Sequence, residues 1–78
     1  MRLIKDYAGA YYAEDVVDGY EVRVEVNSLN GRGWTWQIYI DNKLMHDDGW
    51  NGLTLREIKN DLNFWIDYSI KEYEDRKY

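Results

Sequence analysis

The sequence predicts an α+β fold, in which an antiparallel β-meander of three to four strands packs on one C-terminal α-helix. Two stretches alternate apolar and polar residues with the period of two that is typical of a strand with one buried face. A later stretch repeats its apolar residues at helical spacing after a helix-capping sequence. We therefore expect the helix to cover the apolar side of the meander.

The clearest strand covers residues 20–27, where every second residue is apolar. Asp18 and Gly19 precede it and favour a tight hairpin turn, because both tolerate positive φ angles. The segment from about residue 7 to residue 17 is therefore expected to pair back on this strand, near an edge of the sheet.

The register of this hairpin has two solutions. A two-residue loop places Asp15 opposite Val22, whereas a three-residue loop with a bulge places Glu14 there. Either register brings one carboxylate next to the apolar face.

A second amphipathic strand is expected at residues 34–40, where Trp and Ile alternate with polar residues. Residues 41–43 then turn the chain, with Asn42 in a left-handed conformation, into a short strand at residues 44–46. Two acids and two glycines in residues 47–52 predict a loop.

A capping box, Thr54 with Glu57, predicts the start of the helix, and Leu53 and Ile58 occupy the hydrophobic-staple positions. Helical spacing persists to about Tyr73, and the last residues are expected to fray. The stripe predicted to pack on the sheet is Leu55, Ile58, Leu62, Trp65, Ile66, Ser69, Ile70 and Tyr73.

The composition limits the classes of function. At 78 residues the chain is expected to form a single domain, residues 1–78, and its net charge of −5 disfavours nucleic acid and anionic membranes as direct partners. No apolar run is long enough to span a membrane and no signal-peptide core is present, so we expect a cytoplasmic protein. A basic protein surface is the expected partner.

The helix carries aromatic residues beyond those that folding requires. Phe64 and Tyr68 fall roughly opposite the apolar stripe, four residues apart and among carboxylates. We interpret them as anchors for a basic partner, and the alternative is that Phe64 packs under the N-terminal segment or in a homodimer. The residues predicted to bind a partner are Glu57, Asp61, Phe64, Asp67, Tyr68 and Glu72, together with Tyr11 and Tyr12.

Tyr11 and Tyr12 belong to a tyrosine cluster, with Tyr7, among small residues. The cluster favours either an edge strand that pairs with another chain or a strand that closes one end of the sheet.

No motif predicts catalysis, a cofactor or a metal site. The only histidine, His46, precedes Asp47 and Asp48, but consecutive residues of an extended segment point apart. The glycines at 31 and 33 lack a following helix N-terminus, so they do not form a phosphate-binding loop. We therefore expect a binding protein and not an enzyme.

In size, acidity and aromatic content, the whole chain resembles the small inhibitors that phages and mobile elements direct against host defence, including anti-CRISPR proteins. The resemblance includes no sequence motif. It implies that the protein acts in the host cytoplasm and blocks the basic channel of a nucleic-acid-guided effector, with Glu57, Asp61, Asp67 and Glu72 meeting Lys or Arg. An antitoxin, an immunity protein or a small regulatory subunit would use the same surface and is the alternative.

Overall fold

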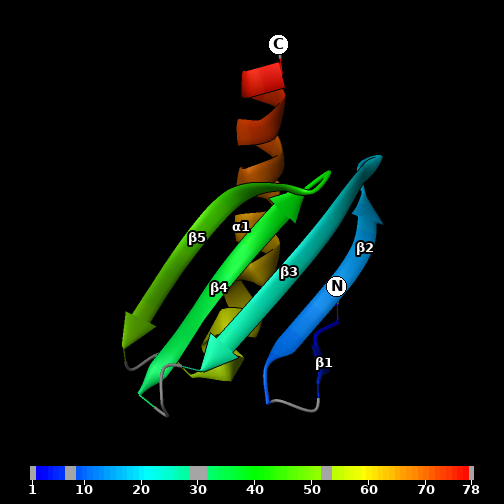
Figure 1. Ribbon diagram of the computed structural model, residues 1–78. Helices are drawn as coiled ribbons and strands as arrows, with labels where there is room; N and C mark the ends of the chain where they lie inside the picture. The colour runs from blue at the N-terminus through cyan, green and yellow to red at the C-terminus, as the bar shows by residue number, and fades with distance from the viewer. Residues whose placement is uncertain (1, 7–8, 29–31, 52–53, 78) are drawn as a thin grey trace.

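In the part of the chain that the structure describes, five antiparallel strands follow one another both along the chain and across one sheet, and a single helix covers one face of it (Figure 1). The computed structural model describes residues 2–6, 9–28, 32–51 and 54–77. The predicted α+β meander is confirmed, with one short N-terminal strand in addition to the expected three to four. The elements are β1 (Ile4–Lys5), β2 (Tyr11–Val17), β3 (Tyr20–Ser28), β4 (Gly33–Ile40), β5 (Lys43–Asn51) and α1 (Leu55–Lys77).

Two tight turns set the register of the sheet. Asp18 and Gly19 have φ angles of 52° and 84°, and Asp41 and Asn42 have φ angles of 49° and 67°. Positive φ at both central residues is the geometry of a two-residue hairpin loop that matches the twist of the strands. The first turn selects the register in which Asp15 lies opposite Val22.

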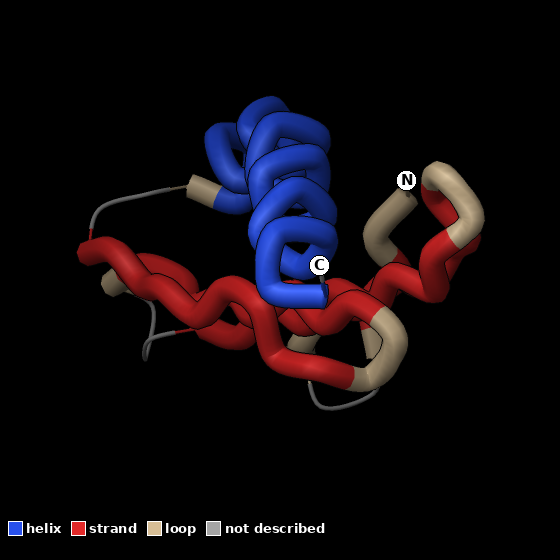
Figure 2. Tube along the Cα trace, turned by 90° about the horizontal axis from the view of Figure 1, so that it is seen from above, coloured by secondary structure: helices blue, strands red, loops and turns tan. Residues whose placement is uncertain are grey.

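The core lies between the sheet and α1, which runs across the sheet face (Figure 2). Alternate residues of β3 and β4 point to the helix, as their period of two predicted, and they meet the apolar stripe of α1. The buried apolar residues of these three elements are Val22, Val24, Val26, Trp36, Ile38, Ile40, Ile58, Leu62, Ile66 and Ile70.

The opposite face of the sheet is mainly polar, but it also exposes the apolar side chains of Val16 and Leu44. The Arg23 guanidinium lies over the Tyr39 ring, 4.3 Å from its centroid, and Gln37 Nε2 donates a hydrogen bond of 3.1 Å to Asp47 Oδ1. These contacts join neighbouring strands without adding an apolar layer.

β5 is longer than predicted. It runs over Lys43–Asn51 and pairs along the whole of β4, so the prediction of a loop at residues 47–52 is wrong for the five residues of that segment that the structure describes. Gly49 lies opposite Thr35, and a Cβ at position 49 would be 2.9 Å from Thr35 Cγ2. The glycine therefore allows a close approach within the sheet and does not mark a turn.

The N-terminal segment also differs from the prediction. β2 begins at Tyr11, and β1 pairs outside it, with Ile4 opposite Tyr12 and Lys5 opposite Tyr11. Tyr7, where the strand was expected to begin, lies outside the described residues. The expected edge strand is thus covered at one end, because β1 takes the sheet edge beside its first two residues.

The capping box at the start of α1 is confirmed. Glu57 N donates to Thr54 Oγ1 at 3.2 Å, and Thr54 N donates to Glu57 Oε1 at 3.3 Å. Leu53, the first member of the predicted staple, lies outside the described residues. Among the residues that the structure describes, no helix has both the length and the apolar character needed to cross a bilayer.

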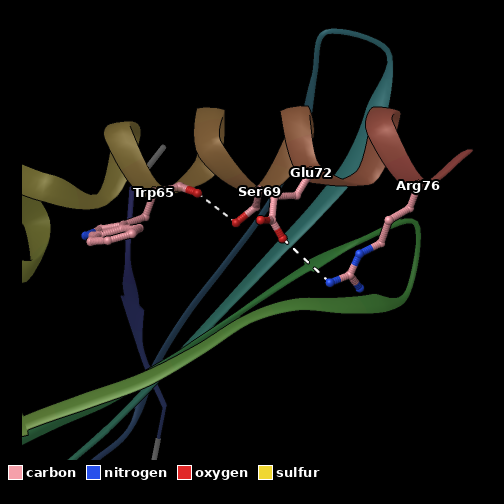
Figure 3. A network of polar contacts seen from close by, with 4 residues as sticks. All are labelled: Trp65, Ser69, Glu72 and Arg76. Atoms are coloured by element: carbon pink, nitrogen blue, oxygen red, sulfur yellow. Dashed lines mark hydrogen bonds and ion pairs between the residues drawn. The ribbon is translucent and has the colours of Figure 1, made fainter. Parts of the chain in front are cut away.

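At its other end the helix continues to Lys77, past the predicted end near Tyr73, and its last turns project beyond the sheet (Figure 1). Tyr20 explains the extension, because its ring packs edge-to-face on Tyr73 and its hydroxyl donates to Glu74 Oε2 at 3.2 Å. Ser69 is fully buried in the stripe, where its hydroxyl donates to the Trp65 carbonyl oxygen at 2.7 Å (Figure 3). Its hydrogen-bonding need is therefore met within the helix.

Candidate protein-binding surface

Phe64 and Tyr68 are the large aromatic residues that α1 exposes most. Phe64 is 62% exposed and Tyr68 is 45% exposed. Both rings also pack edge-to-face on Trp65, with centroid distances of 5.0 Å and 5.8 Å. Each ring is therefore held in place from within the chain and still leaves much of its surface to solvent.

Carboxylates frame this aromatic pair. At about 100° per residue, the outward-facing side chains from Phe64 to Glu72 span an arc of about 80° on the helix. We call these residues the acidic aromatic face. It comprises Glu57, Asp61, Phe64, Tyr68 and Glu72.

The carboxylates of this face differ in their contacts. Glu57 Oε1 accepts hydrogen bonds from the cap residue Thr54, and Glu72 forms an exposed ion pair of 3.7 Å with Arg76 (Figure 3). Exposed i, i+4 pairs of this kind contribute only about 0.3–0.5 kcal/mol, so a partner can replace the Arg76 contact at little cost. Asp67 lies about 60° beyond Phe64, outside the arc, because residues three apart are offset by that angle.

Three rings stack between the sheet and the helix beneath this face. His46 lies between Trp36, at a centroid distance of 6.2 Å, and Trp65, at 4.5 Å. The interplanar angles are 28° and 18°, so the rings are close to parallel. Together with the edge-on rings of Phe64 and Tyr68, the stack connects the acidic aromatic face to the core.

A β-bulge brings His46 into this stack. Ile38 lies opposite His46 while the next residue, Tyr39, lies opposite Leu44, so Met45 is the extra residue on β5. Met45 is buried and His46 stacks under the helix, so two consecutive side chains point to the core. The sequence carries no local signal for the bulge, so this role of His46 could not be predicted from it.

Two ring nitrogens in the stack, Trp36 Nε1 and His46 Nε2, are buried and have no hydrogen-bond partner among the described residues. A cavity of about 20 Å³ lies beside Trp36 and Trp65, with Asp61 in its wall. This volume is enough for about one water molecule and too small for an organic substrate.

The side chains of the two residues after His46 lie on opposite faces of the sheet. Asp47 takes its hydrogen bond from Gln37 on the polar face of the sheet, whereas Asp48 lies opposite Trp36 on the helix side. Within the described part of the chain, no three His, Asp or Glu side chains are grouped to hold a metal ion. The geometry thus gives His46 a packing role.

Tyr11 and Tyr12 do not form one patch. Tyr11 packs edge-to-face on Trp34 at 5.8 Å, and Lys59 Nζ lies 5.9 Å from its ring centroid on the helix side. Tyr12 points to the other face of the sheet, where it is 39% exposed. The structure therefore separates both tyrosines from the acidic aromatic face.

Wider hollows occur away from this face. One of about 400 Å³ is lined by residues of β2 and β3, including Glu14, Glu21 and Arg23. Another of about 420 Å³ separates the N-terminal segment from α1 and is lined by Arg2 and Lys59 among others. Both are open at the surface, and none of the three stacked rings lines either of them.

The acidic aromatic face suits contact with another macromolecule better than enclosure of a small ligand, because its rings are exposed and the cavity beside it measures only about 20 Å³. Comparison with protein-family models, curated proteins and solved structures finds no match for this chain. Residue roles are therefore assigned from the geometry of the chain itself.

Proposed function

We propose that this protein is a non-enzymatic inhibitor that places its acidic aromatic face on a basic, nucleic-acid-binding surface of a host defence effector, as anti-CRISPR proteins do. The observation that carries the proposal is the exposure of Phe64 and Tyr68, at 62% and 45%, between the carboxylates of Asp61 and Glu72. Aromatic residues that fill pockets at the centre of an interface commonly supply most of its binding energy.

The contacts of the two rings support this role. Trp65 packs against one side of Phe64 and of Tyr68, so each ring loses less conformational freedom when a partner covers it. The carboxylates contribute to the association rate and to the choice of partner, because charges at the rim of an interface mainly steer association and select the partner. The rings therefore provide affinity, and the acids provide attraction to Lys and Arg.

Capture of partners from a bacterial lysate on immobilised protein, followed by mass spectrometry, tests the proposal. We expect to capture a large basic protein that binds nucleic acid. In a gel-shift assay, adding the 78-residue protein should displace the nucleic acid from the captured protein. Recovery of a small basic toxin would replace the anti-defence role with that of an antitoxin. If the captured protein still binds its nucleic acid after the 78-residue protein is added, the proposal is contradicted.

Paired variants identify the surface. Phe64→Ala with Tyr68→Ala should weaken partner binding by at least about a hundredfold, because it removes two aromatic anchors. Val16→Ala with Leu44→Ala is the matched control, since these residues are also exposed but lie on the other face of the sheet. Equal binding by both double variants would exclude the acidic aromatic face.

Variants that remove negative charge test whether the carboxylates of the acidic aromatic face speed association with a basic partner. Asp61→Asn with Glu72→Gln should slow association and make it less sensitive to salt, because it removes two negative charges from the face. Glu14→Gln with Glu21→Gln makes the same change of charge on a distant surface and should have a smaller effect. An association rate that does not respond to ionic strength in the unmodified protein would exclude acidic steering.

A further inference from the structure

β5 is the last strand of the sheet, and no strand of the described part of the chain pairs with its outer side. From residue 46 to residue 51 it pairs regularly with β4, and its bulge lies before this stretch. The backbone N–H and C=O groups on the outer side of a regular edge strand can pair with another extended chain. By contrast, β1 already covers the start of β2 at the opposite edge.

The helix side of this edge carries acidic groups. Asp48 is exposed and lies opposite Trp36. Its Oδ1 accepts a hydrogen bond of 2.8 Å from the backbone N–H of Gly49, so an added strand has to replace this bond at Gly49. Asp61 of α1 lines the small cavity beside the same Trp36. Trp65 stacks on His46 of β5, which fixes this part of the helix over the strand. A chain added to β5 would therefore pass close to two carboxylates and the rim of an indole ring.

We propose that the outer edge of β5, over residues 46–51, takes an extended segment of the partner as a sixth strand, and that this segment carries Lys or Arg toward Asp48 and Asp61. The inference rests on the proposed function, because it describes how the same partner extends its contact from α1 onto the sheet. Cations on the added strand would meet the two carboxylates in charge-assisted hydrogen bonds.

The charge of the edge argues for a basic partner and against a second copy of this chain. Two copies of β5 paired with each other would bring Asp47 and Asp48 of both chains to one junction, and facing like charges destabilise a sheet. The net charge of −5 adds long-range repulsion between two copies.

The test uses amide hydrogen exchange of the whole protein, followed by NMR. The probe is a short blocked peptide, in which Lys alternates with Val, at millimolar concentration. The control peptide has the same sequence and charge but carries methyl groups on alternate backbone nitrogens, which removes its donors. The first peptide should slow the exchange of outward-facing amides in residues 46–51 by about tenfold or more, and the methylated peptide should not.

Two further variants locate the charge contact. Asp48→Asn with Asp61→Asn should reduce this protection, whereas Glu14→Gln with Glu21→Gln should preserve it. Equal protection by both peptides, or no protection in β5 at millimolar peptide, would overturn strand addition. Such a result leaves the proposed function intact, because that function is tested separately, by partner capture, by displacement of nucleic acid and by the Phe64 and Tyr68 double variant.

Discussion

His46 lies flat against Trp65, with ring centroids 4.5 Å apart and planes 18° from parallel. This contact joins the edge strand β5 to the helix α1. Trp65 in turn supports Phe64 and Tyr68, so the position of the exposed rings depends on a residue of the sheet.

His46→Ala is expected to lower the free energy of unfolding by about 1 to 3 kcal/mol, because it removes two stacked ring pairs. His46→Phe keeps a flat ring and removes the unpartnered Nε2, so its stability should stay within about 1 kcal/mol of the unmodified protein. Denaturant unfolding monitored by tryptophan fluorescence measures both. If the alanine variant is as stable as the phenylalanine variant, the stack contributes nothing.

Phe64→Ala with Tyr68→Ala should lower the free energy of unfolding by about 1 to 2 kcal/mol, because neither ring is buried but each has one edge-to-face contact with Trp65. Trp65→Ala should cost about 3 to 5 kcal/mol, since it removes a large ring from the packed region. Thermal and denaturant unfolding compare the two variants. A double variant as unstable as Trp65→Ala would assign Phe64 and Tyr68 to the core.

Thr54→Ala should lower stability by about 1 kcal/mol, because it removes the side-chain acceptor for the Glu57 N–H at the helix start. Glu57→Gln keeps an oxygen acceptor for Thr54 N and should change stability by less than about 0.5 kcal/mol. Circular dichroism during unfolding reports both changes. A loss in Glu57→Gln as large as that in Thr54→Ala would show that the charge of Glu57, and not only its acceptor oxygen, stabilises the helix.

Gly49→Ala should cost about 1 to 3 kcal/mol, because the new Cβ would be 2.9 Å from Thr35 Cγ2. Thr35→Ser removes that methyl group and keeps the hydroxyl. In a double-mutant cycle, the serine should therefore recover about 1 kcal/mol of the alanine penalty. Additive effects would mean that Gly49 is needed for a reason other than this contact.

Much of the fold could be predicted because the controlling signals are local. The alternation in β3 and β4 indicates their buried faces, the Asp18 and Gly19 pair predicts a two-residue turn, and Thr54 with Glu57 predicts the start of the helix. Helical spacing also places Phe64 and Tyr68 opposite the buried stripe, and both are exposed.

The errors come from residues whose state depends on distant partners. β4 extends β5 through residues that locally favour a loop, and Tyr20 extends the helix past Tyr73. Local propensity is a weak guide at such positions, because pairing with a neighbouring strand or packing on another element outweighs it.

The sequence by itself therefore determined the meander, its turns, the helix start and the two faces of α1, because each depends on residues close together in the chain. Only the tertiary structure decided that His46 stacks between Trp36 and Trp65, and that this stack joins β5 to α1. The physical reason is the bulge at Met45, which shifts the register within β5 and turns His46 toward a helix about twenty residues later in the chain.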